Sequence, residues 1–132
     1  MAVLIDTSVL VASERGSMDL EELIRPDDVY AISVVSAAEL LHGVHRASSR
    51  RAQARSAFVE AIFNAFSPLP IDLTVARAYA HASAELAKSG TTVDANDLWI
   101  GATAIATGME VLALDGDFAR IPGVELAFAG AR

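Results

Sequence analysis

Residues 3–10 read VLIDTSVL, and this stretch decides the fold class. Its apolar run, residues 3–5, predicts a buried strand that ends directly at Asp6. Four further short apolar runs have the same character, at residues 29–32, 69–71, 111–114 and 124–128. Because these runs are continuous rather than alternating, they are typical of strands buried on both faces of a sheet.

Longer segments rich in alanine and leucine separate these runs. They predict helices over residues 8–14, 20–24, 36–45, 51–66, 75–88 and 95–107. Ser36 and Glu39 form a capping-box pattern that would open the third helix, while Gly90 and Gly108 would end the last two. Strands that alternate with helices indicate a parallel α/β sheet of about five strands with right-handed crossovers. Such sheets bind their ligands at the carboxyl ends of the strands.

Composition and charge exclude several kinds of protein. The 132 residues suffice for one domain, and 53% apolar with 20% charged residues exclude a disordered chain. The absence of cysteine excludes disulfides, thiolate metal sites and cysteine nucleophiles. No apolar run reaches the ~18 residues of a membrane span, and the first residues lack the basic region of a signal peptide, so we expect a cytoplasmic protein. The net charge of −7 argues, taken alone, against a nucleic-acid partner.

Four acids occupy equivalent places in the predicted elements. Asp6 and Asp115 directly follow predicted strands, while Glu39 and Asp97 lie in the first turns of predicted helices. In a parallel sheet all four would meet at one edge and repel one another, and a hard divalent cation such as Mg²⁺ or Mn²⁺ would relieve that repulsion. Each acid also has a purely structural interpretation, as a helix cap, a capping-box member, a helix N-terminal charge or a turn residue.

The same residues resemble the motifs of the PIN-domain family. Residues 3–10, 36–40 (SAAEL), 96–104 (NDLWIGATA) and 114–118 (LDGDF) follow the order and spacing of its four motifs. The size and order are most similar to VapC-type toxins of bacterial toxin–antitoxin pairs, and the resemblance covers essentially the whole chain. Two positions depart from the family pattern. Gly101 replaces an alanine, and Ala113 replaces a threonine that often lies two residues before the fourth acid.

The resemblance implies a single PIN domain over residues 1–132, with three α/β/α layers, that acts as a Mg²⁺- or Mn²⁺-dependent endoribonuclease. It implies that Asp6 and Asp97 bind the metal directly. Glu39 would bind it through water or orient the attacking water, and Asp115 would complete the acidic pocket and could support a second ion. Asp117 is the alternative fourth acid, although its place beyond a glycine favours a role in the turn or in orienting its neighbour. The resemblance further implies a VapB-type antitoxin that blocks the site, and a homodimer.

Two groups of residues are candidates for binding an RNA substrate. Thr7 or Ser8 could donate a hydrogen bond to the scissile phosphate, although a helix cap is the simpler role for either. Four arginines fall within ten residues of one another: Arg46, Arg50, Arg51 and Arg55. Their spacing by four creates a positive stripe on a helix, and such a stripe can hold phosphates. A solvated helix end or a surface for a partner protein remains the alternative.

Other classes of protein fit less well. Glu39 and His42 match the Glu-x-x-His half-site of di-iron helix bundles, but that site needs two such motifs and the chain contains one. A haloacid-dehalogenase-type phosphatase needs a second aspartate two residues after the first, where this chain has Ser8. The remaining alternative is a non-catalytic PIN-like module that binds RNA or protein, and missing acids would mark it.

Overall fold

Five parallel strands form the sheet of the computed structural model, which describes residues 1–128. The strands are β1 (Ala2–Ile5), β2 (Val29–Ser33), β3 (Pro68–Leu69), β4 (Glu110–Ala113) and β5 (Leu126–Phe128). They lie in the order β3-β2-β1-β4-β5, and every neighbouring pair is parallel. The predicted α/β class with a parallel sheet is therefore confirmed, and β1 is the central strand.

Six α-helices and one short 3₁₀ helix connect the strands within these residues. They are α1 (Thr7–Glu14), α2 (Leu20–Leu23), α3 (Val34–Arg46), α4 (Ser49–Ala65), α5 (Leu73–Ser89), α6 (Ala95–Thr107) and the 3₁₀ helix η1 (Asp117–Arg120). All six predicted helices are present, with ends shifted by at most two residues. Gly90 and Gly108 end α5 and α6 with φ angles of 68° and 70°, a left-handed conformation that glycine adopts without strain.

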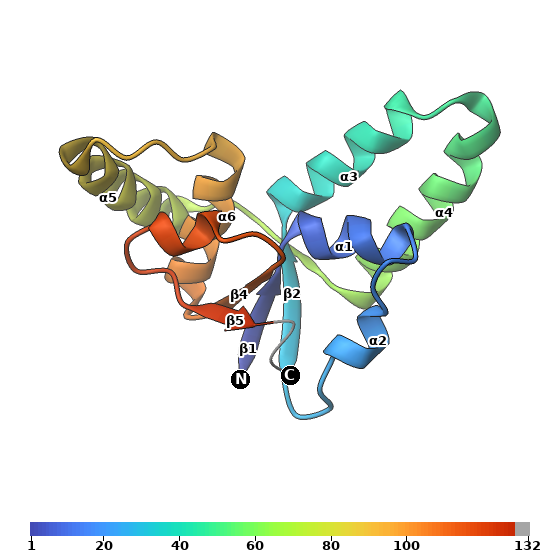
Figure 1. Ribbon diagram of the computed structural model, residues 1–132, viewed down its shortest axis with the longest axis horizontal. Helices are drawn as coiled ribbons and strands as arrows, with labels where there is room; N and C mark the ends of the chain where they lie inside the picture. The colour runs from blue at the N-terminus through green and yellow to red at the C-terminus, as the bar shows by residue number, and fades with distance from the viewer. Residues whose placement is uncertain (129–132) are drawn as a thin grey trace.

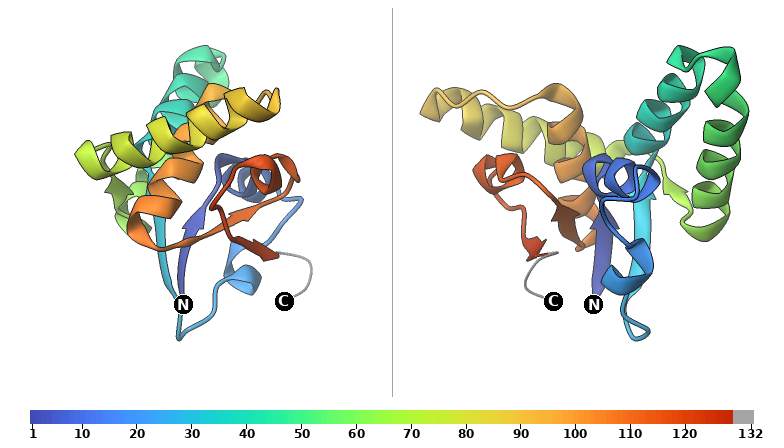
Figure 2. Two further views of the ribbon diagram at one scale, coloured as in Figure 1. Left: turned by 90° about the vertical axis from the view of Figure 1, so that its left-hand side faces the viewer. Right: turned by 45° about the vertical axis from the view of Figure 1, so that its right-hand side comes forward.

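The helices cover both faces of the sheet and give the expected three layers (Figures 1 and 2). Val3 and Ile5 of β1 belong to a core closed by α1, α3 and α4, whereas Leu4 belongs to a second core closed by α5, α6 and η1. Successive side chains of a strand point to opposite faces, so the continuous apolar run in β1 supplies both cores. In Figure 1 the pair α3 and α4 and the pair α5 and α6 form two arms on either side of the sheet.

The capping box predicted at Ser36 and Glu39 is absent. Helix α3 begins two residues earlier, at Val34, and its N-cap is Ser33, whose side chain accepts the N–H of Val35 at 3.0 Å. Because Ser33 is also the last residue of β2, the strand passes into the helix without a loop. Ser36 is fully buried, and the Glu39 carboxylate is free for contacts outside its own helix.

Three strand boundaries differ from the prediction, each for a local reason. The predicted strand 69–71 is shorter because Pro70 has no N–H to donate and Asp72 already caps α5. The predicted strand 124–128 begins only at Leu126, because the N–H of Val124 is held in a turn by the carbonyl of Ile121. The predicted strand 111–114 lies one residue earlier, and Leu114 leaves the sheet with 48% of its surface exposed.

Gly101 of α6 lies where a family alanine would crowd the core. A Cβ atom at this position would stand 3.1 Å from Ile121 Cδ1 and 3.1 Å from Val124 Cγ2. The glycine lets the segment after η1 pack closely against the helix. Among residues 1–128, no helix combines the length and the apolar character that crossing a membrane requires.

Helix η1 has no counterpart in the sequence prediction, yet its Phe118 is fully buried in the core beneath α6. This ring anchors the loop that follows β4. We expect Phe118→Ala to lower the free energy of unfolding by about 3–5 kcal/mol, and Phe118→Leu by about 1 kcal/mol, because leucine refills most of the space. Urea denaturation of the three proteins measures both values. Equal stability of wild type and the alanine variant would contradict this anchoring role.

Candidate active site

Four carboxylates from distant parts of the chain line one cleft of about 520 Å³. Asp6 follows β1, Glu39 lies in α3, Asp97 lies in the first turn of α6, and Asp115 follows β4. All four positions belong to the edge of the sheet where the strands end and these helices begin. The parallel topology thus brings together the acids that the sequence singled out.

Asp6 is almost entirely buried, with 4% of its surface exposed. Its Oδ2 atom accepts hydrogen bonds from the backbone N–H of Ser8 at 3.1 Å and from the Ser8 hydroxyl at 2.6 Å, so Asp6 is the N-cap of α1. Burial raises the pKa of Asp6, and the charge of Asp115 raises it further, while the bonds from Ser8 oppose both effects. The cap and the acidic site are therefore two roles of one side chain.

The hydroxyl groups of Ser8 and Thr7 donate hydrogen bonds to carboxylates of the cleft. The Ser8 hydroxyl donates to Asp6 and also accepts the backbone N–H of Leu114 at 3.2 Å, which ties the loop after β4 to the start of α1. This contact lies next to Ala113, where the family pattern often has a hydroxyl. The Thr7 hydroxyl lies 2.6 Å from Glu39 Oε1. Neither residue is the cap of α1, and both orient acids of the cleft.

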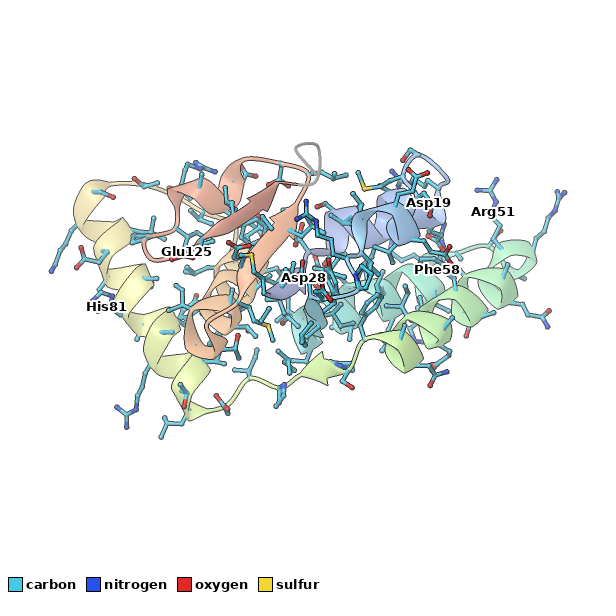
Figure 3. All side chains as sticks on the ribbon, turned by 90° about the horizontal axis from the view of Figure 1, so that it is seen from below. Asp19, Asp28, Arg51, Phe58, His81 and Glu125 are labelled. Atoms are coloured by element: carbon cyan, nitrogen blue, oxygen red, sulfur yellow. The ribbon has the colours of Figure 1, made fainter. Side chains whose placement is uncertain are left out.

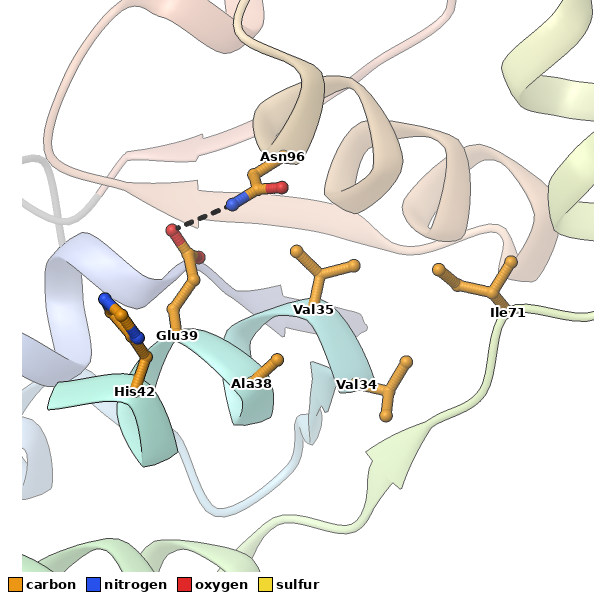
Figure 4. A pocket seen from close by; sticks show the side chains of 7 residues that line it. All are labelled: Val34, Val35, Ala38, Glu39, His42, Ile71 and Asn96. Atoms are coloured by element: carbon orange, nitrogen blue, oxygen red, sulfur yellow. Dashed lines mark hydrogen bonds between the residues drawn. The ribbon is translucent and has the colours of Figure 1, made fainter. Parts of the chain in front are cut away.

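Glu39 is held from two sides. Besides Thr7, the amide of Asn96 at the start of α6 donates to Glu39 Oε2 at 3.5 Å (Figure 4). The same carboxylate forms the boundary between the acidic cleft and a larger groove of about 640 Å³. The other walls of that groove are mostly apolar and include Val35 and Ile71, while His42 and Asn96 add polar groups. It is larger than the cleft, but the acidic side chains gather in the cleft, which is therefore the candidate active site.

The surroundings of Asp97 shift the pKa of its carboxyl group strongly upward. Burial and the charges of Asp6, Asp94, Asp115 and Asp117 together raise its pKa to about 6. The N-cap of α6 is Asp94, whose side chain accepts the N–H groups of Asn96 and Asp97. Because a different residue caps this helix, the Asp97 carboxylate lines the cleft, where the other acids repel its negative form.

Asp115 and Asp117 occupy different environments. Asp115 is two residues beyond the end of β4 rather than directly after it, and it lines the cleft. Its Oδ1 atom accepts the backbone N–H of Asp117 at 3.1 Å, which holds the turn. The Asp117 carboxylate instead forms a 3.2 Å salt bridge with Arg120. The arrangement favours Asp115 as the fourth acid and gives Asp117 an orienting backbone contact.

The cleft also contains a cation that the sequence prediction missed. Arg15 lines it together with Ser8, Val11 and Ala12 of α1. The spacing 8, 11, 12 and 15 places these residues on one face of a helix, and this pattern was the available signal. Of the predicted arginine stripe, Arg50, Arg51 and Arg55 line a depression shared with Arg15, whereas Arg46 is not part of its lining.

The donor set suits a hard divalent ion that keeps much of its water. Within residues 1–128, no three acidic or histidine side chains are placed to hold one ion directly. All acidic donors at the cleft are nevertheless oxygens, and burial first and neighbouring negative charges second raise the pKa values of Asp6 and Asp97. Mg²⁺ commonly binds through one or two carboxylates and retains several waters. The residues present fit that mode of binding.

Comparison with known proteins identifies the family. The PIN domain model matches residues 3–124. Ribonuclease VapC5 of Mycobacterium tuberculosis is 42% identical over 124 residues, which cover 92% of this chain and 89% of VapC5. The structure of VapBC-5, a toxin–antitoxin system of the same organism, matches with a TM-score of 0.77 and 35% identity over 96% of both chains. A DNA-bound VapBC from Salmonella typhimurium shares the fold, with a TM-score of 0.90 at 23% identity over 98% of both chains.

The chain belongs to the PIN-domain family, as a VapC-type member. The resemblance drawn from the four motifs is therefore confirmed.

The raised pKa of Asp97 predicts how the metal-free protein responds to pH. In the unfolded chain this carboxyl titrates near its ordinary value of 3.8, so between pH 3.8 and about 6 the folded state binds more protons. Stability from this group is therefore lost as the pH rises through that window. At pH 7 we expect Asp97→Asn to stabilise the protein by an amount on the order of 1–2 kcal/mol, allowing for solvent screening, and to have little effect near pH 4.

Chemical denaturation in EDTA at both pH values measures this difference. Asp27→Asn, at an exposed position away from the cleft, is the matched control and should leave the stability unchanged at pH 7. A destabilised Asp97→Asn variant at pH 7 would contradict the interpretation that the acids repel one another.

Proposed function

We propose that this protein is a Mg²⁺- or Mn²⁺-dependent endoribonuclease and the toxin of a VapBC-type toxin–antitoxin pair. The observation that carries the proposal is the meeting of four carboxylates, from four separate segments, in one cleft. The relatives support it, because VapC5 is named a ribonuclease and the similar VapBC-5 structure is described as a toxin–antitoxin system. The negative net charge does not oppose it, since several of the acids belong to the cleft.

The acids have distinct roles in the proposed reaction. Asp6 and Asp97 hold the ion, because burial and mutual repulsion give these two carboxylates the greatest need of a positive charge. Glu39, fixed by Thr7 and Asn96, orients the attacking water. Asp115 completes the negative pocket. When bound, the ion lowers the pKa of a coordinated water and stabilises negative charge on the phosphate oxygens.

The partners follow from the same proposal. A VapB-type antitoxin would cover the cleft, and the cytoplasm is the compartment where such a toxin meets its RNA substrate. A homodimer would bury the apolar groove beside Glu39, whose surroundings include the exposed side chains of Val34, Ile71 and Leu73. Leu73 exposes 66% of its surface at the start of α5. Association there would remove apolar surface from water.

Removal of one ion-binding carboxylate tests the proposal. We expect Asp6→Asn and Asp97→Asn each to lower Mg²⁺- or Mn²⁺-dependent cleavage of RNA at least about a hundredfold, because the remaining acids hold the ion too weakly. Both variants should remain folded. The control is Asp27→Asn, which should cut at the wild-type rate. Quantified RNA cleavage and end sequencing measure the effect, and wild-type activity in either site variant would refute the assignment.

The response of the melting temperature to metal separates a nuclease from a non-catalytic module. Mg²⁺ or Mn²⁺ that binds only the folded state stabilises it, by roughly 2.7 kcal/mol at a hundred times the dissociation constant. We expect such a shift for the wild type and a much smaller one for Asp6→Asn. An RNA- or protein-binding module without a metal site would show equal melting temperatures with and without the ion.

The two acids of the loop after β4 should differ in importance. We expect Asp115→Ala to reduce the single-turnover cleavage rate at least about tenfold more than Asp117→Ala, because only Asp115 lines the cleft. The Asp117 variant keeps the backbone N–H that Asp115 accepts. The reverse order of the two rates would show that the fourth carboxylate comes from within η1.

A further inference from the structure

A groove lined by arginines leads out of the acidic cleft along α1 and α4. Arg15 lines the cleft, a narrow passage of about 170 Å³ beside it, and a depression of about 530 Å³ beyond. The passage also includes Glu39 and Arg55, and the depression includes Arg50 and Arg51. Neighbouring hollows share residues of their walls, and Arg15 lines all three, so the hollows adjoin one another along this surface. We call the passage and the depression together the arginine groove.

The arginine groove is lined by four arginines and two glutamates, Glu14 and Glu39, so its net charge is opposite to that of the cleft. Arg55 forms a 3.4 Å salt bridge with Glu14 and donates to the carbonyl of Gly43 at 3.4 Å, so its charge is already balanced. Arg15, Arg50 and Arg51 are exposed, and none of them forms a salt bridge with any residue in the described part of the chain. Three uncompensated guanidinium groups thus border a path that begins at four carboxylates.

The far part of the groove also contains an aromatic ring. Phe58 lines the depression with Arg50 and Arg51, and Figure 3 shows it between α4 and α1, with Arg51 projecting from the first turn of α4. Phe58 packs against the core with part of its surface exposed. A positive groove with an aromatic side chain is the combination by which proteins bind single-stranded nucleic acid, since the cations hold phosphates and the ring stacks on a base.

We infer that the arginine groove holds the single-stranded flank of the RNA next to the bond that is cut. The inference rests on the proposed nuclease function, since it assigns a path to that substrate. An RNA strand that crosses the cleft must leave it on both sides, and the path over Arg15 is continuous with the acids. Arg15, closest to the carboxylates, binds the phosphate adjacent to the scissile one, and Arg50 and Arg51 bind phosphates farther along.

Binding of RNA to a cleavage-deficient protein tests the inference without catalysis. The Asp97→Asn protein is titrated with a labelled single-stranded RNA of mixed sequence, in EDTA and at several salt concentrations. Adding Arg15→Gln, or Arg50→Gln with Arg51→Gln, should raise the Kd roughly tenfold at low salt and reduce the slope of log K against log salt by about 0.7 for each arginine removed.

Arg77→Gln is the matched control. Arg77 is exposed on α5, in the opposite arm of the molecule, and forms no salt bridge within residues 1–128; its removal changes the net charge by one unit, as the removal of Arg15 does. We expect it to leave both the Kd and the salt slope close to their starting values. In the cleavage-competent protein, Arg15→Gln should raise the KM for RNA more than it lowers kcat, because it binds a flank rather than the reacting atoms.

Three results would overturn the inference. The groove variants could bind RNA as tightly as the parent, or Arg77→Gln could weaken binding equally, which would show only a general effect of charge. The groove variants could also keep their RNA affinity but escape inhibition by the co-expressed antitoxin, which would assign the groove to a protein. Because binding is measured without metal, failure of the wild type to cleave RNA would refute the proposed function separately.

Discussion

The constraint on which this structure depends is the burial of a carboxylate at the end of its central strand. Val3, Leu4 and Ile5 supply both hydrophobic cores, so β1 cannot shift without emptying them. The strand ends at Asp6, which keeps only 4% of its surface exposed. A buried carboxylate is unfavourable unless hydrogen bonds or a cation compensate it. Ser8 provides the hydrogen bonds, and the proposed cation would provide the remaining compensation.

The same requirement explains why the surrounding acids reduce stability. Burial and, after it, neighbouring negative charges raise the pKa of Asp97, so in the metal-free protein at neutral pH its ionised form is held against both effects. Such an arrangement has no value for folding, and sites of this kind are expected where function needs them. The hydroxyl of Ser8 and the capping carboxylate of Asp94 fix the elements that carry these acids. The cleft therefore keeps its shape when no cation neutralises the negative charge of the acids.

The sequence predicted those features that depend on burial over several residues. The five strands, the six helices and the convergence of Asp6, Glu39, Asp97 and Asp115 all follow from apolar runs and parallel topology. The prediction from sequence failed where two nearby residues could each take the same structural role. Ser33, not Ser36, caps α3, because the strand passes directly into the helix. Helix η1 was missed because its stability comes from one buried ring, Phe118, rather than from a periodic pattern.

Tertiary contacts account for the remaining differences at the site. The stripe from Arg46 to Arg55 was predicted as one surface, but a salt bridge turns Arg55 toward Glu14 of α1, and Arg46 lies outside the lining of the groove. Arg15, at the C-terminal end of α1, also lines this groove. No pattern within α4 could reveal this, because the pairing depends on how α1 packs beside α4.

The distribution of charge, rather than its sum, decides which partner this protein can take. A net charge of −7 predicts repulsion of nucleic acid at long range, but salt screens this repulsion beyond the Debye length of about 8 Å at physiological ionic strength. Within that distance, the ligand experiences only the nearest side chains. The cleft is negative and can accept a phosphodiester only together with a cation, whereas the adjoining groove is positive and can accept phosphates directly. The two regions would therefore attract different components of the proposed complex, the cleft a cation and the arginine groove the phosphates beside the bond that is cut.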